Sequence, residues 1–557
     1  MRSRKLPCHP ERSEGPGRPG RHDVAHHPPR SLAHARDDIA FASLWTLTAL
    51  SRFLAIARSP WDWDEVQFMR GVRAYDVSLH APHPPGYPVY IALAKLVRLA
   101  ANSDFHALQA IVVAAGIALF PVVFFLAREL GFTNRTALAG ATLTAFLPNV
   151  WFYGGTAMSD LPALVSGLFA CVLLLRGRTT SGAIVLALSI GIRSQNILLA
   201  ILPLVLLRRR AIKPLVVTIV LAAAIYGAAA AISPRYFEAL HAQEAWIQST
   251  DAVGAPGRPP LRSLFVWYFV LPVDARKLFI PITLLALVPL ALRRRAAWKT
   301  FALFAPFALF AFLMLSPEAI ARYSIGYIVA YALLAIDGLD VVLRKAPLHV
   351  AASAALIVAC AAWTWRPLHV VHTQDSPPWR ATQWIVHNVP PHTRVWGGDA
   401  FEPFVRYSLG DYDTASPDAD WLILDHDVLT RCPKFRYEYG RLWRVARQRN
   451  FAVNVVAKNQ LPHFGAGWHP EEWGELFASR WMSRRADVTM PAFGRPATLE
   501  MIGDLPAPHG FTTIRRTWPS DGKHATTVYI TIPHPSRIAD DPRELGFRLR
   551  SITWIPE

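Results

Sequence analysis

The chain has 557 residues, of which 52% are hydrophobic and only 18% are charged. This composition excludes an intrinsically disordered protein and disfavours an ordinary soluble enzyme, so we predict a membrane protein with water-exposed parts. The net charge of +18 predicts no nucleic-acid partner, because most of the excess Lys and Arg residues lie at the ends of apolar segments. The four cysteines are too scattered to predict a disulfide framework or a CxxC metal pair: Cys8, Cys171, Cys360 and Cys432.

Residues 1–36 are rich in basic residues, Pro and Gly and contain no apolar stretch. Such a segment cannot bury enough surface to fold, so we expect a disordered basic tail. It does not resemble a cleavable signal peptide, because no apolar core with a small-residue cleavage site follows it.

Residues 37–366 consist of one apolar segment after another, which predicts a polytopic bundle of about eleven membrane-spanning helices. Several segments are shorter than the roughly 20 residues that cross a bilayer comfortably, and 181–192 and 195–207 could form one broken crossing. The predicted spans are 39–57, 107–126, 136–153, 159–175, 181–192, 195–207, 213–233, 278–292, 300–315, 323–343 and 348–365.

The orientation follows from the short loops that collect Lys and Arg, because cationic loops resist translocation. A cytoplasmic N-terminus places Arg208–Arg210 and Arg293–Arg295 inside and puts everything after 366 outside. This arrangement requires 86–101 to lie along the outer surface. If 86–101 crosses the membrane instead, 181–207 must be a single span. The predicted location is the cytoplasmic (inner) membrane.

The C-terminal part predicts two extracytoplasmic domains. In 367–455, helix-like and strand-like segments alternate, which favours a small α/β domain. In 456–557, short alternating strands are separated by Pro, Gly and Asp turns, which favours a β-sandwich. Neither a GxxxxGK[ST] nor a GxGxxG phosphate loop occurs in the sequence, so a nucleotide site has no support.

The first predicted outer loop, 58–106, opens with an acidic cluster of Asp62, Asp64 and Glu65. Carboxylates at a bilayer surface suit general-base catalysis, because they can take a proton from a hydroxyl while a lipid-borne reagent arrives from the side. The alternative interpretation is a solvated loop whose acids avoid the membrane.

Prolines near the end of this loop hold the backbone extended and present His80 and His83. Two His residues at this spacing, without an obvious third ligand, are weak metal ligands and are more often polar caps. A hydrogen bond from one of them to a phosphate is a better functional prediction.

Four further residues gain interest because the predicted topology puts them on the same outer side. Asp160 is either a helix cap with Ser159 or an acidic site residue. Arg193 is either a turn residue that reaches the interface or a substrate contact, because a charge in an apolar stretch needs water or a partner. Arg322 and Tyr323 either anchor the chain at the interface or bind a phosphate.

Acids and cations gathered at one outer interface indicate a reaction with a phosphate leaving group. In these residues the sequence resembles the GT-C superfamily of membrane glycosyltransferases, which includes protein O-mannosyltransferases, aminoarabinose transferases and oligosaccharyltransferase catalytic subunits. The resemblance covers about 39–366 and rests on short motifs in a shared order: Asp64-Glu65, His83-Pro84-Pro85-Gly86-Tyr87-Pro88, Asp160 and Arg322-Tyr323.

The resemblance implies an inverting transfer of a sugar from a polyprenyl-phosphate donor to a lipid, glycan or protein acceptor. It implies that Asp64 is the base, with Asp62 as an alternative, and that Glu65 orients the acceptor or the base. Asp160 would be a second acidic position, and the donor phosphate would contact His83, Arg193, Arg322 and Tyr323. A divalent metal is possible, because some GT-C members use one, but the second outer loop lacks a clear DxD or DxE.

Two other functions stay open from the sequence. A transporter of lipid-linked saccharides predicts polar residues at several depths of the bundle, whereas the spans here are largely apolar. A non-catalytic envelope protein would bind glycans through tryptophans of its β-domain and would tolerate loss of Asp64. Tryptophans in a short sandwich are more often core residues.

Overall fold

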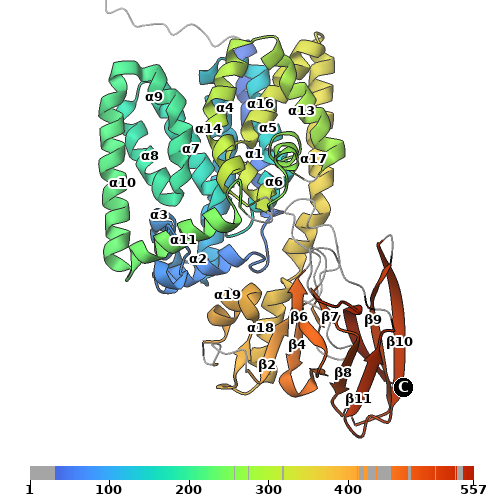
Figure 1. Cartoon of the computed structure of the whole chain (residues 1–557). Helices are drawn as coiled ribbons and strands as arrows, with labels where there is room; N and C mark the ends of the chain where they lie inside the picture. Colours follow the sequence, from blue (N-terminus) through green and yellow to red (C-terminus); the bar gives the residue numbers. More distant parts are fainter. Residues whose placement is uncertain are drawn as a thin grey trace, which may run out of the picture.

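A computed structural model of the chain describes residues 32–556, except for 256–257, 274, 317–318, 411, 413–418, 425–433, 436–452, 474–477, 493, 508–509, 534 and 536–542. A helical bundle is followed by two smaller parts that contain β-sheets (Figure 1). Most of the expected tail 1–36 lies outside the described residues, whose first helix, α1 (Leu32–Phe53), takes in the end of that range.

The bundle consists of apolar helices packed around one large core. Helix α4 (Asp104–Leu130), of 27 residues, begins where the Ser103 side chain accepts from the His106 N–H and ends at Gly131 in the left-handed conformation. The other helices that correspond to predicted spans are α7 (Asp160–Leu175), α8 (Thr179–Ile192), α10 (Ile212–Ile232), α13 (Arg276–Ala291), α14 (Arg295–Met314), α16 (Ile328–Val342) and α17 (Ala346–Thr373).

Within the described ranges, four helical segments are long and apolar enough to cross a membrane. A fifth is present if the pair Ile320–Gly326 and Ile328–Val342, bent by 71°, counts as one span. The predicted count of about eleven spans, and the placement of each in a bilayer, are therefore not confirmed. The four segments are Asp104–Leu130, Ser194–Ile232, Arg295–Met314 and Ala346–Asn388.

Three predicted segments are interrupted or extended. Segment 136–153 forms two helices, α5 (Asn134–Phe146) and α6 (Pro148–Tyr153), because the residue before a proline avoids the helical conformation. Segment 195–207 forms the 3₁₀ helix η2 (Ser194–Ala200) and α9 (Ile201–Leu207). Helix α17 continues to Thr373, past the predicted domain boundary at 366.

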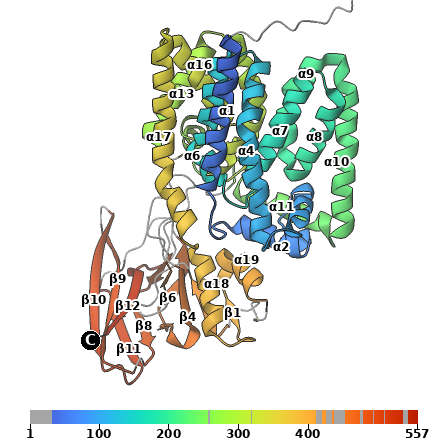
Figure 2. The same cartoon turned by 180° about the vertical axis from the view of Figure 1, so that it is seen from behind.

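The two predicted outer loops contain short helices. The first holds α2 (Trp63–Arg73) and α3 (Pro88–Arg98), and the second holds α11 (Tyr236–Thr250) and α12 (Leu261–Phe265). With 11 residues, α3 spans only about 16 Å, which is too short to cross the hydrocarbon. This length agrees with the orientation that has a cytoplasmic N-terminus, in which 86–101 does not cross. Both views show α2 and α11 across the end of the bundle that faces the C-terminal part (Figures 1 and 2).

Hydrogen bonds fasten the two outer loops to each other. The Ser233 hydroxyl accepts from the Val77 N–H at 2.8 Å, and the Tyr236 hydroxyl donates to the Pro85 carbonyl at 2.7 Å. The loop that carries His83 is therefore held from outside by the start of α11.

The first C-terminal part has the expected alternation of helices and strands. Helices α18 (Pro377–Asn388) and α19 (Gly398–Ser408) accompany a four-stranded sheet of order β1-β2-β4-β3, in which only β1 and β2 are parallel. Its strands are β1 (Val395–Trp396), β2 (Trp421–Leu424), β3 (Lys434–Phe435) and β4 (Val453–Ala457).

The last part has two antiparallel sheets, of orders β10-β9-β12-β7-β6 and β11-β8-β5, which share an apolar core as a sandwich requires. Strand β4 contacts both C-terminal cores, because Val456 belongs to this one and Val453 to that of the α/β part. The strands are β5 (His463–Phe464), β6 (Trp468–Trp473), β7 (Ala478–Met482), β8 (Arg485–Met490), β9 (Ala497–Ala507), β10 (Gly510–Ser520), β11 (Thr526–Thr531) and β12 (Phe547–Pro556).

Candidate active site

The acidic cluster of the first outer loop forms the start of α2. The Asp62 carboxylate accepts from the Asp64 N–H at 3.0 Å, and the Glu65 carboxylate accepts from the Asp62 N–H at 2.8 Å, which together form a capping box. This cap fixes where α2 begins and thereby sets the directions of the Asp62 and Asp64 side chains.

Glu65 is buried and fully engaged within the protein. Its carboxylate accepts from the backbone N–H groups of Trp61 and Asp62 and from that of Ala157, at 2.6, 2.8 and 2.6 Å. Burial raises the pKa of Glu65 to about 7, although the N–H group of Ala157 opposes this shift. The side chain therefore ties α2 to the connection between α6 and α7, just before Asp160, at which α7 begins.

Arg322 lies at the centre of three aspartates. Its Nη2 is 2.7 Å from Asp64 Oδ2, its Nη1 is 3.5 Å from Asp62 Oδ1, and its Nε is 3.9 Å from Asp160 Oδ2. Arg322 comes from α15 (Ile320–Tyr323), the short helix just before the 71° bend. Arg322 therefore reaches the start of α2, and two segments that are far apart in the sequence meet in one site.

Asp160 and Arg193 form a second buried ion pair beside the first. Arg193 Nη1 is 2.7 Å from Asp160 Oδ1, with side chains that are 9% and 6% exposed. Arg193 stands in extended backbone at the end of α8, and Asp160 begins α7. The expected side-chain cap by Ser159 is not formed; its hydroxyl instead lies 3.5 Å from Arg193 Nη1.

The Tyr323 ring joins the two arginines. Its centroid is 4.8 Å from the Arg322 guanidinium and 5.9 Å from that of Arg193. Arg322 Nη2 also donates to the Tyr323 hydroxyl at 3.2 Å. Cation–π contacts at these distances help to keep two like charges close together.

His83 contacts the same acid from the loop before α3. Its Nδ1 is 2.8 Å from Gln67 Oε1 and 3.7 Å from Asp64 Oδ1, and its Nε2 is 2.7 Å from the Tyr87 hydroxyl. Burial lowers the pKa of His83 to about 4, against the attraction of Asp64. A phosphate contact from His83 requires one of these hydrogen bonds to open. His80, which the sequence pairs with it, is exposed.

The two aspartates of α2 differ in acidity. Burial favours the neutral form of each, but for Asp64 the charge and the hydrogen bond of Arg322 lower the pKa to about 2 against this effect. For Asp62, burial and the nearby Asp64 prevail over Arg322 and raise the pKa. Asp64 is therefore the residue that stays ionised, and Asp62 is the carboxyl that accepts a proton more readily.

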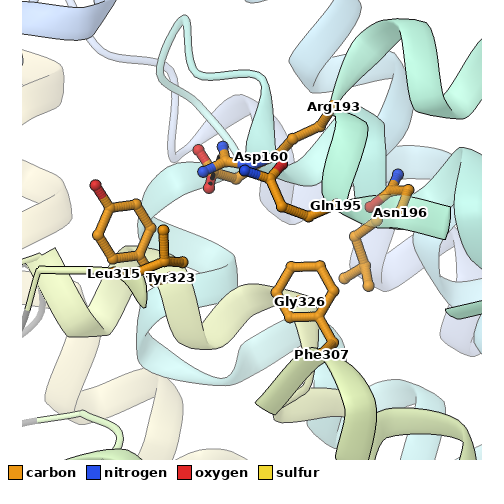
Figure 3. A pocket seen from close by; sticks show the side chains of 9 residues that line it. Asp160, Arg193, Gln195, Asn196, Phe307, Leu315, Tyr323 and Gly326 are labelled. Carbon is orange, nitrogen blue, oxygen red and sulfur yellow. Dashed lines mark ion pairs between the residues drawn. The ribbon is translucent and has the colours of Figure 1, made fainter. Parts of the chain in front are cut away.

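A pocket opens beside the ion pair of Asp160 and Arg193, whose side chains line it (Figure 3). The space between its walls is about 310 Å³ when the open solvent in front of them is counted, and both polar and apolar residues line it. Gln195 Oε1 and Asp160 Oδ2 are buried there without a hydrogen-bond partner, as is Arg322 Nε beside them. Such atoms favour a bound polar group. The lining residues are Asp160, Leu164, Arg193, Gln195, Asn196, Phe307, Leu315, Tyr323 and Gly326.

Sequence reasoning missed Gln67, Tyr87 and Gln195. Gln67 stands one helical turn after Asp64, a spacing that would have placed it on the same face. Tyr87 follows Gly86 in the proline-rich motif and adopts a left-handed conformation, with φ 48°. Gln195 is two residues beyond Arg193 in η2, and an uncharged amide gives no signal of its own in the sequence.

The divalent metal that the sequence allows finds no preformed ligand set among the described residues. In the described part of the chain, no three His, Cys, Asp or Glu side chains come close enough together to hold a metal ion. The three aspartates of the site do face a common point, but the guanidinium of Arg322 stands there.

The fold is similar to that of a solved structure, in agreement with the resemblance that the sequence predicts. ArnT from Cupriavidus metallidurans bound to undecaprenyl phosphate matches with a TM-score of 0.50 over 76% of this chain and 98% of that one, at 12% identity. At this identity the likeness concerns the fold alone.

Two archaeal structures match less well. The Archaeoglobus fulgidus oligosaccharyltransferase in complex with Zn and sulfate has a TM-score of 0.46 at 12% identity, over 92% of this chain and 98% of that one. AglB from the same organism, in complex with an inhibitory peptide and a dolichol-phosphate, has a TM-score of 0.41 at 15% identity, over 73% of this chain and 64% of that one. No family model and no curated protein matches the sequence.

Proposed function

We propose that the chain is an inverting glycosyltransferase that moves a sugar from a polyprenyl-phosphate donor to a lipid, glycan or protein acceptor. The observation that carries this proposal is the 2.7 Å ion pair between Arg322 and Asp64, next to a pocket with charged and apolar walls. A cation for a leaving phosphate and a carboxylate for the incoming nucleophile are the two groups that such a transfer needs.

The pocket suits the donor. Arg193, Arg322 and Tyr323 bind the phosphate, because fixed guanidinium groups meet its charge without reorganising. Phe307 and Leu315 form an apolar wall for the first part of the prenyl chain. The unpartnered Gln195 Oε1 accepts a hydrogen bond from a sugar hydroxyl.

The transfer is a single displacement at the anomeric carbon. An acceptor hydroxyl or amine attacks from the side opposite the phosphate, the bond between this carbon and the phosphate oxygen breaks, and polyprenyl phosphate leaves with the electron pair. Asp64 takes the proton of the acceptor. In its ion pair Asp64 is a weak base, and its basicity rises when the donor phosphate draws Arg322 toward itself.

Glu65 and His83 are positioning residues in this proposal. Glu65 holds the start of α2 against the connection to α7 through three backbone hydrogen bonds. His83 stays uncharged and orients Asp64 from the loop side. Asp62 is the alternative base, because it also contacts Arg322.

The proposed location is the outer face of the cytoplasmic membrane, with a multi-pass bundle, a cytoplasmic N-terminus and both C-terminal domains outside. Supporting this orientation, Arg208–Arg210 precede α10, and the 21 residues of α10 separate them from α11 at the end that carries the site. Cationic loops favour the cytoplasmic side, so the site end faces out.

The test is sugar transfer from a labelled polyprenyl-phosphate donor by the purified full-length chain in lipid. Asp64→Asn is expected to bind donor but to lower turnover by about 10²–10⁴-fold, because general-base catalysis contributes that much. Glu238→Gln, an exposed acid of α11, is the matched control and should keep wild-type turnover. Wild-type turnover by Asp64→Asn, with loss only in Asp62→Asn, would assign the base to Asp62.

A further inference from the structure

The cation at the centre of the site has an unusual set of neighbours. Arg322 contacts Asp62, Asp64 and Asp160, which come from two elements far apart in sequence. Carboxylates are the ligands that a hard divalent cation such as Mn²⁺ or Mg²⁺ prefers, although these three are too far apart as they stand to hold one. Here the position among them is taken by a guanidinium, which belongs to the chain and is always charged.

Arg322 links the three carboxylates to the pocket. One edge of the guanidinium reaches Asp62 and Asp64, and Nε faces Asp160 Oδ2 across 3.9 Å without a hydrogen bond. The unpartnered Nε and the adjacent pocket leave one side of this cation available to an anion. A metal in such a site would likewise bind carboxylates on one side and a phosphate on the other.

We propose that Arg322 replaces a divalent metal ion, as the fixed cation that links the aspartates to the donor phosphate. This inference rests on the proposed function for the identity of the anion only. A metal could not enter beside Arg322, because two cations would then share one position and repel each other. Removing the guanidinium should therefore create a metal site where the native protein has none.

The first experiment measures Mn²⁺ binding by electron paramagnetic resonance on the full-length chain in detergent, without any sugar donor. The wild type is expected to bind no Mn²⁺ at this site, and Arg322→Ala about one ion per chain, through the carboxylates that it uncovers. Asp62 and Asp64 are each 22% exposed, which leaves them room to turn toward the ion. Adding Asp64→Asn to Arg322→Ala should abolish the binding.

Arg294→Ala is the matched control. Arg294 pairs with the buried Asp337 at 3.2 Å, but with a single carboxylate, so its removal should create no Mn²⁺ site. Arg322→Lys keeps a cation among the aspartates and should also bind none. If Arg322→Ala does not fold, Arg322→Gln takes its place. Mn²⁺ binding by the wild type would overturn the inference whether or not either variant folds.

The second experiment measures donor turnover with a chelator and with added Mn²⁺. The wild type should keep its turnover in EDTA, and Mn²⁺ should restore part of the turnover that Arg322→Ala has lost. Mn²⁺ bound by the wild type, EDTA-sensitive turnover, or a folded Arg322→Ala that binds no Mn²⁺ would overturn the inference. Mn²⁺ binding is measured without a donor. If sugar transfer is not observed, the proposed function is refuted, but the inference about Arg322 is still tested by Mn²⁺ binding.

Discussion

Arg322 Nη2 lies 2.7 Å from Asp64 Oδ2, although Arg322 belongs to α15 and Asp64 to the first turn of α2. Both side chains are mostly buried, at 8% and 22% exposure. A buried ion pair contributes little net stability, because its attraction has to offset the desolvation of two charges. The pair is therefore weak evidence for a role in folding.

Arg322→Ala tests the donor side of the site. We expect it to lower turnover by about 10²–10³-fold, as removal of a preorganised donor to a developing charge does. The KM for the polyprenyl-phosphate donor should rise far more than the KM for the acceptor. Steady-state kinetics with each substrate varied in turn measures the difference, and an equal loss for both substrates would contradict the phosphate role.

Glu65→Gln tests the fastening of α2. A glutamine has one acceptor oxygen in place of two, and its NH₂ group would face a backbone N–H, so we expect a loss of about 1–3 kcal/mol in unfolding free energy. Because burial raises the pKa of Glu65 to about 7, its ionisation costs more in the folded state than in the unfolded one. The contribution of Glu65 to stability is thus fully present below its ordinary pKa, near 4.5, and is lost as the pH rises through 7.

The readout for Glu65 is the thermal midpoint in detergent between pH 4.5 and 8. The wild type should show the decrease, and Glu65→Gln should lack this part of the pH dependence because it carries no titratable group. If the two proteins show the same slope, another group is responsible for it.

The arrangement of the site was partly predictable from the sequence. Helix ends and cationic loops place Asp64, Asp160, Arg193 and Arg322 on one side, and the contacts between them agree with that. The engagement of Glu65 was not predictable, because it depends on the N–H group of Ala157, in a distant connection. Backbone donors carry no sequence signal, whereas side-chain charges do.

The fold, too, was predictable from the sequence only in part. The strands of the last domain follow the two-residue alternation of the sequence, so their positions were predictable. The number of spans was not, because an apolar stretch of suitable length can form a bent pair, such as Ile320–Gly326 with Ile328–Val342. Packing against neighbours, and not hydropathy, decides where such a stretch breaks.

Tyr407→Phe tests how the α/β part contacts the site helix. The Tyr407 hydroxyl donates to Asp104 Oδ2 at 2.8 Å, and Asp104 also pairs with Arg73 of α2 at 2.8 Å. The Arg73 guanidinium lies 3.6 Å from the Tyr407 ring centroid, a contact that phenylalanine keeps. We expect a loss of about 1.5–3 kcal/mol, the usual contribution of a hydrogen bond to a charged group.

Hydrogen exchange of α19 and α2 measures this effect, and both helices should exchange faster in Tyr407→Phe. Tyr412→Phe is the control, because the Tyr412 hydroxyl donates to the Val389 carbonyl within the same domain. If Tyr412→Phe accelerates exchange in α2 as much as Tyr407→Phe does, the contact with Asp104 is not specific.

Gly155→Ala tests the backbone support beneath the site. A Cβ at Gly155 would lie 1.7 Å from the Ala55 carbonyl oxygen, so the chain leading to the acidic cluster would have to move. That chain is held in place because the Gly155 carbonyl accepts from the Ala57 N–H at 2.9 Å and from Gln109 Nε2 at 2.7 Å. We expect Gly155→Ala to lose turnover and to lower the thermal midpoint, since a packed interior transmits such a shift.

Gly227→Ala in α10 is the control, because a Cβ there meets no atom within 4 Å. It should leave turnover unchanged and add up to about 1 kcal/mol of helix stability. Wild-type turnover in Gly155→Ala would mean that Asp62 and Asp64 do not depend on this contact for their positions.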